Sequence, residues 1–200
     1  MNEQQSLAAA IHEAVTLRPY DASWPAAYAA ERERLLRALP GVFLGLEHIG
    51  STAVPGLMAK PIVDLMAGVA SMAVAESVAA ALCACGYTTS AEFNATLSDR
   101  KWFMRWADGH RTHHLHVVVH EGQAWHERLR FRDALRADPA LAARYVELKA
   151  SAAEQHASDR EAYTDAKAGF VRAVSGAAQP LHHEDLPLPL KHQTFEEKKP

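Results

Sequence analysis

The stretch from residue 62 to residue 69, with the sequence IVDLMAGV, is apolar at nearly every position. Side chains alternate between the two faces of a strand, so a strand that is apolar at successive positions is covered on both faces. This pattern predicts a central strand of a layered sheet. The stretch carries one acid, Asp64, and a carboxylate is costly to bury unless a metal, a base or a donor meets it. Asp64 is therefore a candidate functional residue.

The other strand patterns predict a mixed sheet around this central strand. A strand is expected at residues 42–49, before a short loop of glycine, serine and proline. Two more strands are expected at residues 101–107 and 112–120, and Asp108-Gly109 between them is a strong hairpin signal.

Helices are expected on either side of these strands. One begins near Ser23, with Pro25 in its first turn, and ends near residue 39. An alanine-rich helix is expected at residues 71–85, and helical spacing dominates residues 122–174, with breaks near residues 138–139 and 156–159. This order is typical of an α+β or α/β domain: a mixed sheet flanked by helices, with further helices at its C-terminal end.

Composition along the chain predicts three regions. Residues 1–16 are polar and alanine-rich and are expected to form a flexible segment, residues 17–175 the folded domain, and residues 176–200 a disordered tail rich in proline, histidine and charge. The histidine pair of that tail, His182 and His183, is expected to be solvated rather than to bind a metal.

Charge and hydropathy argue against several classes of partner. The formal net charge of -3 disfavours broad, nonspecific nucleic-acid binding. Apolar runs stay well short of the roughly 18 residues that cross a bilayer, so no membrane span is expected. Cys83 and Cys85 lie too close for a usual disulfide, which favours a reduced, cytoplasmic setting. A small-molecule substrate is the expected partner, and the oligomeric state stays open.

Gly50-Ser51-Thr52 follows the expected strand at residues 42–49 and is a candidate phosphate-binding turn. Small residues let a phosphate approach the backbone closely, although a tight loop with no ligand needs glycine equally well. Twelve residues after Thr52, Asp64 could bind a divalent metal that faces the phosphates. Many such sites carry a second acid two residues later, where this chain has Met66, a poor ligand for Mg²⁺. A structural acid that accepts hydrogen bonds from the loop is the alternative for Asp64.

His114 and His116 are also two residues apart, which places both on one face of their expected strand. If that strand neighbours the strand of Asp64, the three side chains could form a metal site that suits Mn, Fe or Zn better than Mg. The alternative is the solvent-facing side of a hairpin. His48, beside the turn, is a third histidine candidate, and a packed histidine that caps the loop is equally consistent.

Two basic patterns occur on the expected C-terminal helices. Arg128, Arg132 and Arg136 recur every four residues, and such a stripe either binds phosphate or forms a solvated face. The pattern Tyr-x-x-x-Lys occurs twice, as Tyr145 with Lys149 and as Tyr163 with Lys167. Each pair places a ring beside a cation, either to stack a base and neutralise a phosphate or as a packed Tyr with a snorkelling Lys.

Several of these residues belong to a longer pattern that resembles the GrpB family. The pattern includes HIGSTAVPGL at residues 48–57 and AKPIVD at residues 59–64. Further marks follow along the chain: Tyr20-Asp21, Trp24-Pro25, His114-Leu115-His116-Val117, Phe131-Arg132-Asp133, Leu135-Arg136, Leu148-Lys149 and Phe170. The resemblance runs from about residue 16 to residue 174, nearly the whole expected domain.

The resemblance implies a fold like that of the nucleotidyltransferase superfamily, whose members have a Gly-Ser turn and acids that bind Mg²⁺ and a nucleoside triphosphate. Gly50 and Ser51 match the turn and Asp64 matches the first acid, whereas Met66 departs from the pair. The activity implied is transfer of a nucleotidyl group, from ATP or another nucleoside triphosphate, to an unknown small acceptor. The expected metal is Mg²⁺ or Mn²⁺, with Zn²⁺ as a further option.

In this hypothesis Asp64 and His116 are the catalytic, metal-holding residues. The phosphate-binding residues would be Gly50, Ser51, Thr52, Lys60, Arg132, Lys149 and Lys167. One alternative is a module that binds a nucleotide or another anion without chemistry. Another is a different metal-dependent enzyme in which Asp64, His114 and His116 are the ligands.

Overall fold

The computed structural model describes residues 14–107 and 109–176. Within them, five strands form one mixed sheet in the order β1-β2-β5-β4-β3. The strands are β1 (Gly45–Ile49), β2 (Val63–Val69), β3 (Tyr87–Thr88), β4 (Arg100–Ala107) and β5 (His110–Val119). β2 and β5 are parallel, and the other neighbouring pairs are antiparallel. The interior position of β2 and its burial at nearly every residue confirm the predicted central strand.

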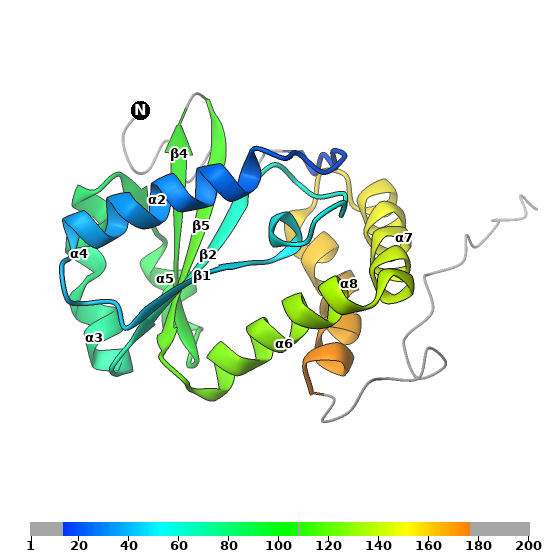
Figure 1. The fold of residues 1–200 in the computed structure, drawn as a ribbon. Helices are drawn as coiled ribbons and strands as arrows, with labels where there is room; N and C mark the ends of the chain where they lie inside the picture. The colour runs from blue at the N-terminus through cyan, green and yellow to red at the C-terminus, as the bar shows by residue number, and fades with distance from the viewer. Residues whose placement is uncertain (1–13, 108, 177–200) are drawn as a thin grey trace, which may run out of the picture.

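Helices α2 (Trp24–Ala38), α3 (Met72–Ser77) and α4 (Ala79–Ala84) cover one face of the sheet. Alternate residues of β2, including Leu65 and Ala67, share a hydrophobic cluster with Leu35 of α2 and Leu82 of α4. The intervening residues, among them Asp64 and Met66, therefore point to the opposite face. Figure 1 shows α2 lying across the strands on the side of this cluster.

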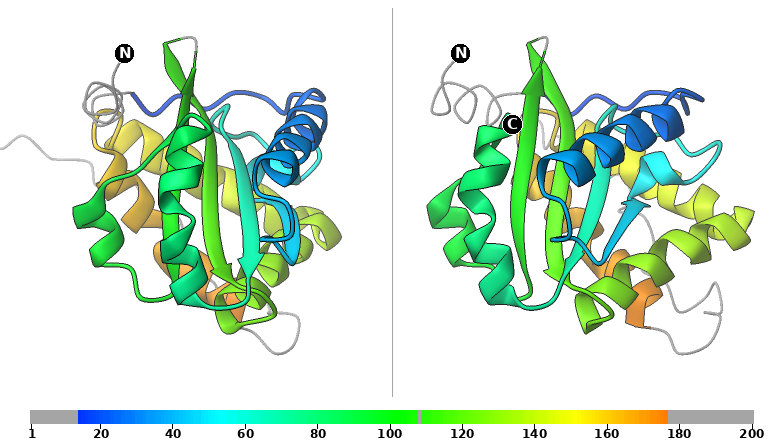
Figure 2. Two further views of the ribbon diagram at one scale, coloured as in Figure 1. Left: turned by 90° about the vertical axis from the view of Figure 1, so that its left-hand side faces the viewer. Right: turned by 60° about the vertical axis from the view of Figure 1, so that its left-hand side comes forward.

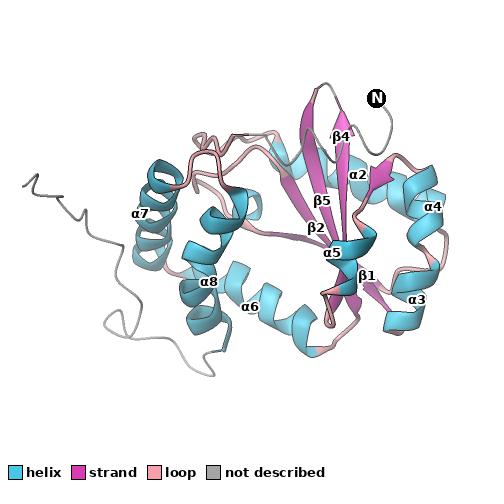
Figure 3. Cartoon of the chain, turned by 180° about the vertical axis from the view of Figure 1, so that it is seen from behind, coloured by secondary structure: helices cyan, strands magenta, loops and turns pink. Residues whose placement is uncertain are grey.

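Helices α6 (Gln123–Ala137), α7 (Pro139–Gln155) and α8 (Arg160–Gly176) stand together beside the sheet (Figures 1 and 3). They form a second hydrophobic cluster that includes Phe131, Tyr145 and Phe170. Val54 and Leu57 join this cluster from the segment after the 3₁₀ turn η1 (Ser51–Ala53). One short segment thus connects the sheet to the C-terminal helices.

The α+β class is confirmed, and the breaks between the C-terminal helices fall where the sequence predicts them. Asp138 caps α7 by accepting hydrogen bonds from the N–H groups of Ala140 and Leu141, and Pro139 is the first residue of the helix. The hairpin is also confirmed on both sides of Asp108, which lies outside the described residues. Strands β4 and β5 extend past the other strands at one end of the sheet (Figure 2).

Three details differ from the sequence expectations. The helix predicted at residues 71–85 is divided at Val78, which ends α3 and begins α4. The structure adds two short elements without a sequence signal, β3 and α5 (Ala91–Ala95). The folded part also begins before residue 17, because Val15 is buried and donates its N–H to the carbonyl of Ala157 at 2.9 Å.

Residues 1–13 and the region beyond residue 176, which contains His182 and His183, lie outside the described residues. Among the helices that the structure does describe, none combines the length and apolar character that a bilayer crossing requires.

Candidate functional site

The turn after β1 lies directly against Asp64. Gly50 has φ +70° and ψ -169°, a backbone conformation that is essentially restricted to glycine. A Cβ atom at this position would lie 2.4 Å from Oδ2 of Asp64. The glycine therefore serves both the bend of the turn and the close approach of the turn to the carboxylate.

Asp64 and His114 form a hydrogen-bonded pair across the parallel strands β2 and β5. The two residues are register partners, and Nδ1 of His114 lies 3.0 Å from Oδ1 of Asp64. Nη1 of Arg111 lies 3.4 Å from Nε2 of the same ring. An arginine can only donate, so Nε2 is the acceptor in this arrangement and Nδ1 carries the hydrogen that Asp64 accepts.

The pKa shifts of the pair agree with this assignment. Burial raises the pKa of Asp64, but the hydrogen bond from His114 and nearby positive charges outweigh it and hold the pKa below its ordinary value. Burial lowers the pKa of His114, and the hydrogen bond with Asp64 offsets only part of that effect. Near neutral pH the pair is therefore a carboxylate beside a neutral imidazole.

His116 lies on the same face of β5 but not beside Asp64. Its register partner on β2 is Met66, so it lies two residues farther along the sheet, about 7 Å away at the usual rise of a strand. Burial lowers its pKa to about 3, and its Nδ1 is buried without a hydrogen-bond partner. Across residues 14–107 and 109–176, no three His, Cys, Asp or Glu side chains form a group that could hold a metal ion. The predicted metal cluster of Asp64, His114 and His116 is therefore not formed.

Thr52 and His48 form a buried hydrogen bond that holds the turn against β1. The Oγ1 atom of Thr52 lies 3.0 Å from Nε2 of His48, and Thr52 is only 1% exposed. The His48 ring stacks on Tyr28 of α2, and burial lowers its pKa to about 4. This geometry matches the packed histidine that caps the loop. It also leaves the Thr52 hydroxyl no access to a ligand, contrary to its predicted role.

Three lysines from different segments gather near the turn, and we call them the lysine cluster: Lys60 before β2, Lys149 on α7 and Lys167 on α8. The amino groups of Lys60 and Lys167 lie 4.9 Å and 3.4 Å from the ring centroid of Tyr163. Lys149 donates to Oγ of Ser51 at 3.2 Å and to the carbonyl of Met58. The structure thus brings three of the predicted phosphate-binding lysines into one region, where Lys149 is buried and is the one that contacts Ser51 directly.

Burial disfavours the charged forms of two lysines in the cluster. Burial lowers the pKa of Lys149 to about 7. Burial, together with the charges of Lys60 and Lys149, lowers the pKa of Lys167 to about 6. Both amines therefore titrate near neutral pH, and a negatively charged ligand would favour their protonated forms. The two Tyr-x-x-x-Lys patterns both supply a ring that faces a cation, Tyr145 for Lys149 and Tyr163 for Lys167.

The arginine stripe of α6 mainly holds the helix in place. Arg132 donates to Oε2 of Glu47 at 2.7 Å and to the carbonyl of His48 at 3.1 Å, and it also pairs with Asp133. Arg136 donates twice to the carbonyl of Ala53. These contacts bind α6 to β1 and η1. Because the Arg132 guanidinium already has protein partners in these contacts, its assignment to phosphate binding stays a prediction.

Sequence reasoning missed Arg111, which contacts His114 at the site. The sequence has no signal for it, because its role depends on a side chain that reaches along β5 rather than on a motif.

Comparisons with known proteins agree on one family. A family model described as GrpB protein matches residues 14–176. A UPF0157 protein of Streptomyces coelicolor is 38% identical over 171 residues, which cover 82% of this chain and 84% of that protein. The crystal structure of the conserved protein GrpB from Enterococcus faecalis matches with a TM-score of 0.71 and 31% identity. That match covers 80% of this chain and 95% of the solved one.

A more distant match is a crystal structure of a Cid1 poly(U) polymerase mutant bound to MgATP. It has a TM-score of 0.47 and 14% identity, and it covers 91% of this chain and 59% of that one. At this TM-score and identity, the similarity supports no inference about the reaction.

Proposed function

This chain belongs to the GrpB family, and from that premise we propose that it binds a nucleoside triphosphate such as ATP between the Gly50-Ser51 turn and helices α7 and α8. We further propose that it transfers the nucleotidyl group to a small acceptor. The observation that carries the proposal is the lysine cluster, which reaches Ser51 through Lys149 and lies near Asp64 of the Asp64–His114 pair.

Charge complementarity supports a ligand with several negative charges. Three lysine amino groups meet near the carboxylate of Asp64, which His114 already contacts. A triphosphate would favour their protonated forms and offset the repulsion among these charges. The rings of Tyr145 and Tyr163 are buried, so they support the lysine amino groups rather than contact the nucleotide.

The turn supports the phosphate end of the ligand. The first N–H groups of any helical turn lack partners within that turn, and η1 begins directly after Gly50. The Asp64 carboxylate fills the space beside Gly50, so a phosphate would meet the turn at Ser51 rather than at Gly50. Ser51 adds a hydroxyl that Lys149 already orients.

The side chains of the site could help to hold Mg²⁺ but could not form a Zn²⁺ site. A protein-built site for Zn²⁺ does not fit, because no group of three ligands exists in the described part of the chain. Mg²⁺ is usually held by one or two carboxylates and by the substrate phosphates, and Asp64 could supply one such carboxylate. An ion held in this way would neutralise phosphate charge.

The residues of the site could support transfer of the nucleotidyl group to a hydroxyl of the acceptor. An acceptor hydroxyl oxygen would bond to the α-phosphorus, the bond between that phosphorus and the oxygen bridging to the β-phosphate would break, and pyrophosphate would leave. The hydroxyl proton would pass to Nε2 of His114, the unprotonated nitrogen, once Arg111 turns from that nitrogen to the bound ligand. The lysine cluster would stabilise the charge on the leaving pyrophosphate.

A second candidate is a nucleotide-binding module that carries out no transfer. Met66 favours it, because a fully buried thioether occupies the position where a second metal-binding acid would stand.

Two variants on α8 test the binding site. Lys167→Gln removes one cation of the cluster, and Arg172→Gln removes an exposed cation of the same helix as the control. We expect Mg·ATP to raise the melting temperature of the wild type, and Lys167→Gln to weaken ATP binding about tenfold while Arg172→Gln leaves it nearly unchanged. Absence of any ATP effect on the wild type, or equal effects of both variants, would contradict the proposal.

Pyrophosphate release separates transfer from binding. The wild type and Asp64→Asn would be incubated with Mg·ATP and a mixture of small hydroxylated acceptors. Release by the wild type alone, with ATP binding retained in Asp64→Asn, supports transfer. Equal background release by both proteins, with ATP bound, leaves the binding module as the function.

A further inference from the structure

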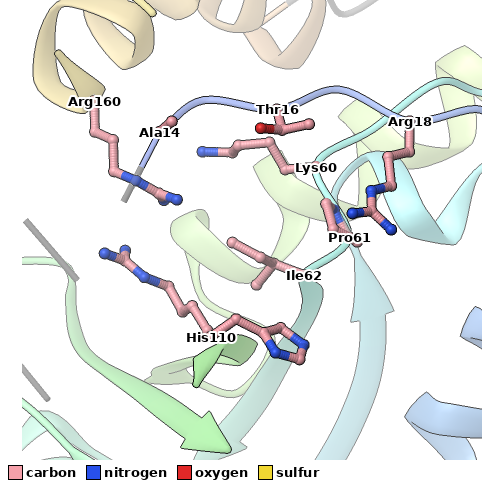
Figure 4. Close-up of a pocket in the computed structure, with 9 residues that line it drawn as sticks. Ala14, Thr16, Arg18, Lys60, Pro61, Ile62, His110 and Arg160 are labelled. Carbon is pink, nitrogen blue, oxygen red and sulfur yellow. The ribbon is translucent and has the colours of Figure 1, made fainter. Parts of the chain in front are cut away.

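A pocket of about 490 Å³ opens beside the candidate site. Its volume falls within the range of roughly 300–1,000 Å³ that is usual for small-molecule sites. We call it the basic pocket, and it is lined by Ala14, Thr16, Arg18, Lys60, Pro61, Ile62, His110, Arg111 and Arg160. Figure 4 shows the side chains of Lys60 and Arg160 directed toward the same space.

The lining is strongly positive. Four of its nine described residues are Arg or Lys, and none of the nine is Asp or Glu. The four cations come from separate parts of the chain: Arg18 precedes α2, Lys60 precedes β2, Arg111 lies on β5 and Arg160 begins α8. Concave walls with one sign of charge concentrate ions of the opposite sign. Guanidinium groups suit phosphate in particular, because they can donate two parallel hydrogen bonds.

Part of the wall is apolar. Ala14, Pro61 and Ile62 line the pocket together with the cations. A pocket for a bare inorganic anion would gain little from this surface, whereas an organic ligand could bury carbon atoms against it. The lining therefore suits a small organic molecule with at least two negative charges.

Two contacts connect the basic pocket to the candidate site. Lys60 lines the pocket, and its amino group also lies 4.9 Å from the Tyr163 ring centroid, within the lysine cluster. Arg111 lines the pocket, and its Nη1 lies 3.4 Å from Nε2 of His114. A ligand held by Lys60 and Arg111 would thus lie next to the Asp64–His114 pair.

We propose that the basic pocket binds a second substrate, a small organic molecule that carries a diphosphate or bisphosphate group. If the proposed nucleotidyl transfer is correct, on which this assignment rests, that molecule is the acceptor. The pocket then makes the enzyme selective for anionic acceptors, and Arg18 and Arg160 recognise the acceptor without contacting the nucleotide.

The test uses inorganic pyrophosphate as the probe of the pocket. It is titrated calorimetrically into the 200-residue chain, which is first saturated with Mg²⁺ and an ATP analogue that cannot be hydrolysed. The test variant is the double substitution Arg18→Gln with Arg160→Gln. The control is Arg37→Gln with Arg172→Gln, which removes two exposed arginines and so changes the net charge equally.

We expect the wild type and the control to bind one equivalent of pyrophosphate in the presence of the analogue. The test variant should bind it about tenfold or more weakly, with the affinity for the analogue changed less than about twofold. If the double variant does not fold, the single variant Arg160→Gln is compared with the single variant Arg172→Gln. Weaker pyrophosphate binding by Arg160→Gln is then the expected result.

The proposal is wrong if the analogue excludes pyrophosphate from the wild type, since the pocket would then belong to the nucleotide site. It is also wrong if the test variant binds pyrophosphate as the control does. Failure of the wild type to bind the analogue would overturn the proposed function instead. In that case, loss of pyrophosphate binding in the test variant but not in Lys167→Gln would still support an anion site in the basic pocket.

Discussion

The backbone at Gly50 and the carboxylate of Asp64 are so close that a single methyl group at position 50 would lie 2.4 Å from Oδ2. Both strands are otherwise regular at this point, since Ile49 and Asp64 are register partners in the antiparallel pair β1–β2. The turn and the acid therefore hold fixed positions relative to each other, which is the property that a pre-organised binding site requires.

Gly50→Ala should destabilise the fold and weaken ATP binding, because the new Cβ atom forces apart Asp64 and the turn that carries Ser51. The strained backbone alone costs about 1–3 kcal/mol, and displacement of Asp64 adds to that cost. Gly56→Ala is the control: Gly56 also has φ +78°, but a Cβ there meets no described atom within 4 Å. Urea unfolding and ATP titration of both variants check this prediction, and equal losses in the two would contradict it.

Lys167→Met should alter how stability depends on pH. The pKa of Lys167 falls from 10.5 to about 6 in the folded protein, mainly through burial and then through the charges of Lys60 and Lys149. Below about pH 6 the amine is charged in the folded and unfolded states, and the folded state bears the full penalty. As the pH rises from about 6 to about 10.5, the folded state binds fewer protons than the unfolded state, so the free energy of unfolding increases.

Lys167→Met removes this titrating amine, so its free energy of unfolding lacks the part of the increase that is due to Lys167. It should therefore be more stable than the wild type at pH 6, and the difference should shrink as the pH approaches 10. Urea unfolding at pH 6, 8 and 10 measures the difference, and Arg172→Met serves as the exposed control on the same helix. A difference that stays constant across this range would show that Lys167 keeps its ordinary pKa.

Glu31→Gln should destabilise the sheet face that α2 covers. Glu31 is 3% exposed, forms ion pairs with Arg34 and Arg105, and accepts a hydrogen bond from the Tyr87 hydroxyl at 2.6 Å. Removal of one partner from such a buried network costs about 3–5 kcal/mol. Glu33→Gln, which breaks an exposed pair with Arg37, should cost less than about 1 kcal/mol.

The acid dependence of stability provides a second measure of Glu31. Burial raises its pKa, but the hydrogen bonds from Arg34 and Tyr87 outweigh that effect and lower the pKa from 4.5 to about 2. The stabilisation is complete above about pH 4.5 and is lost as the pH falls toward about 2. Glu31→Gln should show a flatter decline over this interval, and a decline equal to that of the wild type would assign it to other carboxylates.

Arg132→Ala should lower stability with little effect on ATP binding. The substitution removes the hydrogen bonds to Glu47 and to the carbonyl of His48, which together correspond to about 1–3 kcal/mol. Unfolding and ATP titration of the variant test both parts. A loss of ATP affinity of about tenfold or more would instead place Arg132 on the phosphates, as the sequence pattern predicted.

Regular elements long enough to show periodicity could be predicted from the sequence. The apolar run of β2, the hairpin of β4 and β5, and the helices α6 to α8 with their Asp and Pro breaks all fall in this class. β3 has two residues and α5 has five, which is too short for a period to be visible. The division at Val78 carries no glycine or proline, so composition could not reveal it.

The site was only partly predictable because strand neighbours are set by tertiary structure. The spacing of His114 and His116 places both on one face, but only the register shows that His114 meets Asp64 and that His116 meets Met66. In the same way, the Tyr-x-x-x-Lys patterns locate Lys149 and Lys167 on helices without showing that both approach the turn. The basic pocket draws cations from four distant segments, and no motif connects them.

The segment from Gly50 to Leu57 lies between the Asp64 carboxylate on the sheet and the hydrophobic cluster of α6, α7 and α8, which Val54 and Leu57 join. The lysine cluster lies across the same boundary, with Lys60 before β2 and Lys149 and Lys167 on the helices. A ligand bound there would act as a cross-link between two units that could otherwise unfold locally and independently. Amide hydrogen exchange in α8 would then slow together with exchange in β2, and occupancy of the site would set how cooperatively the whole domain opens.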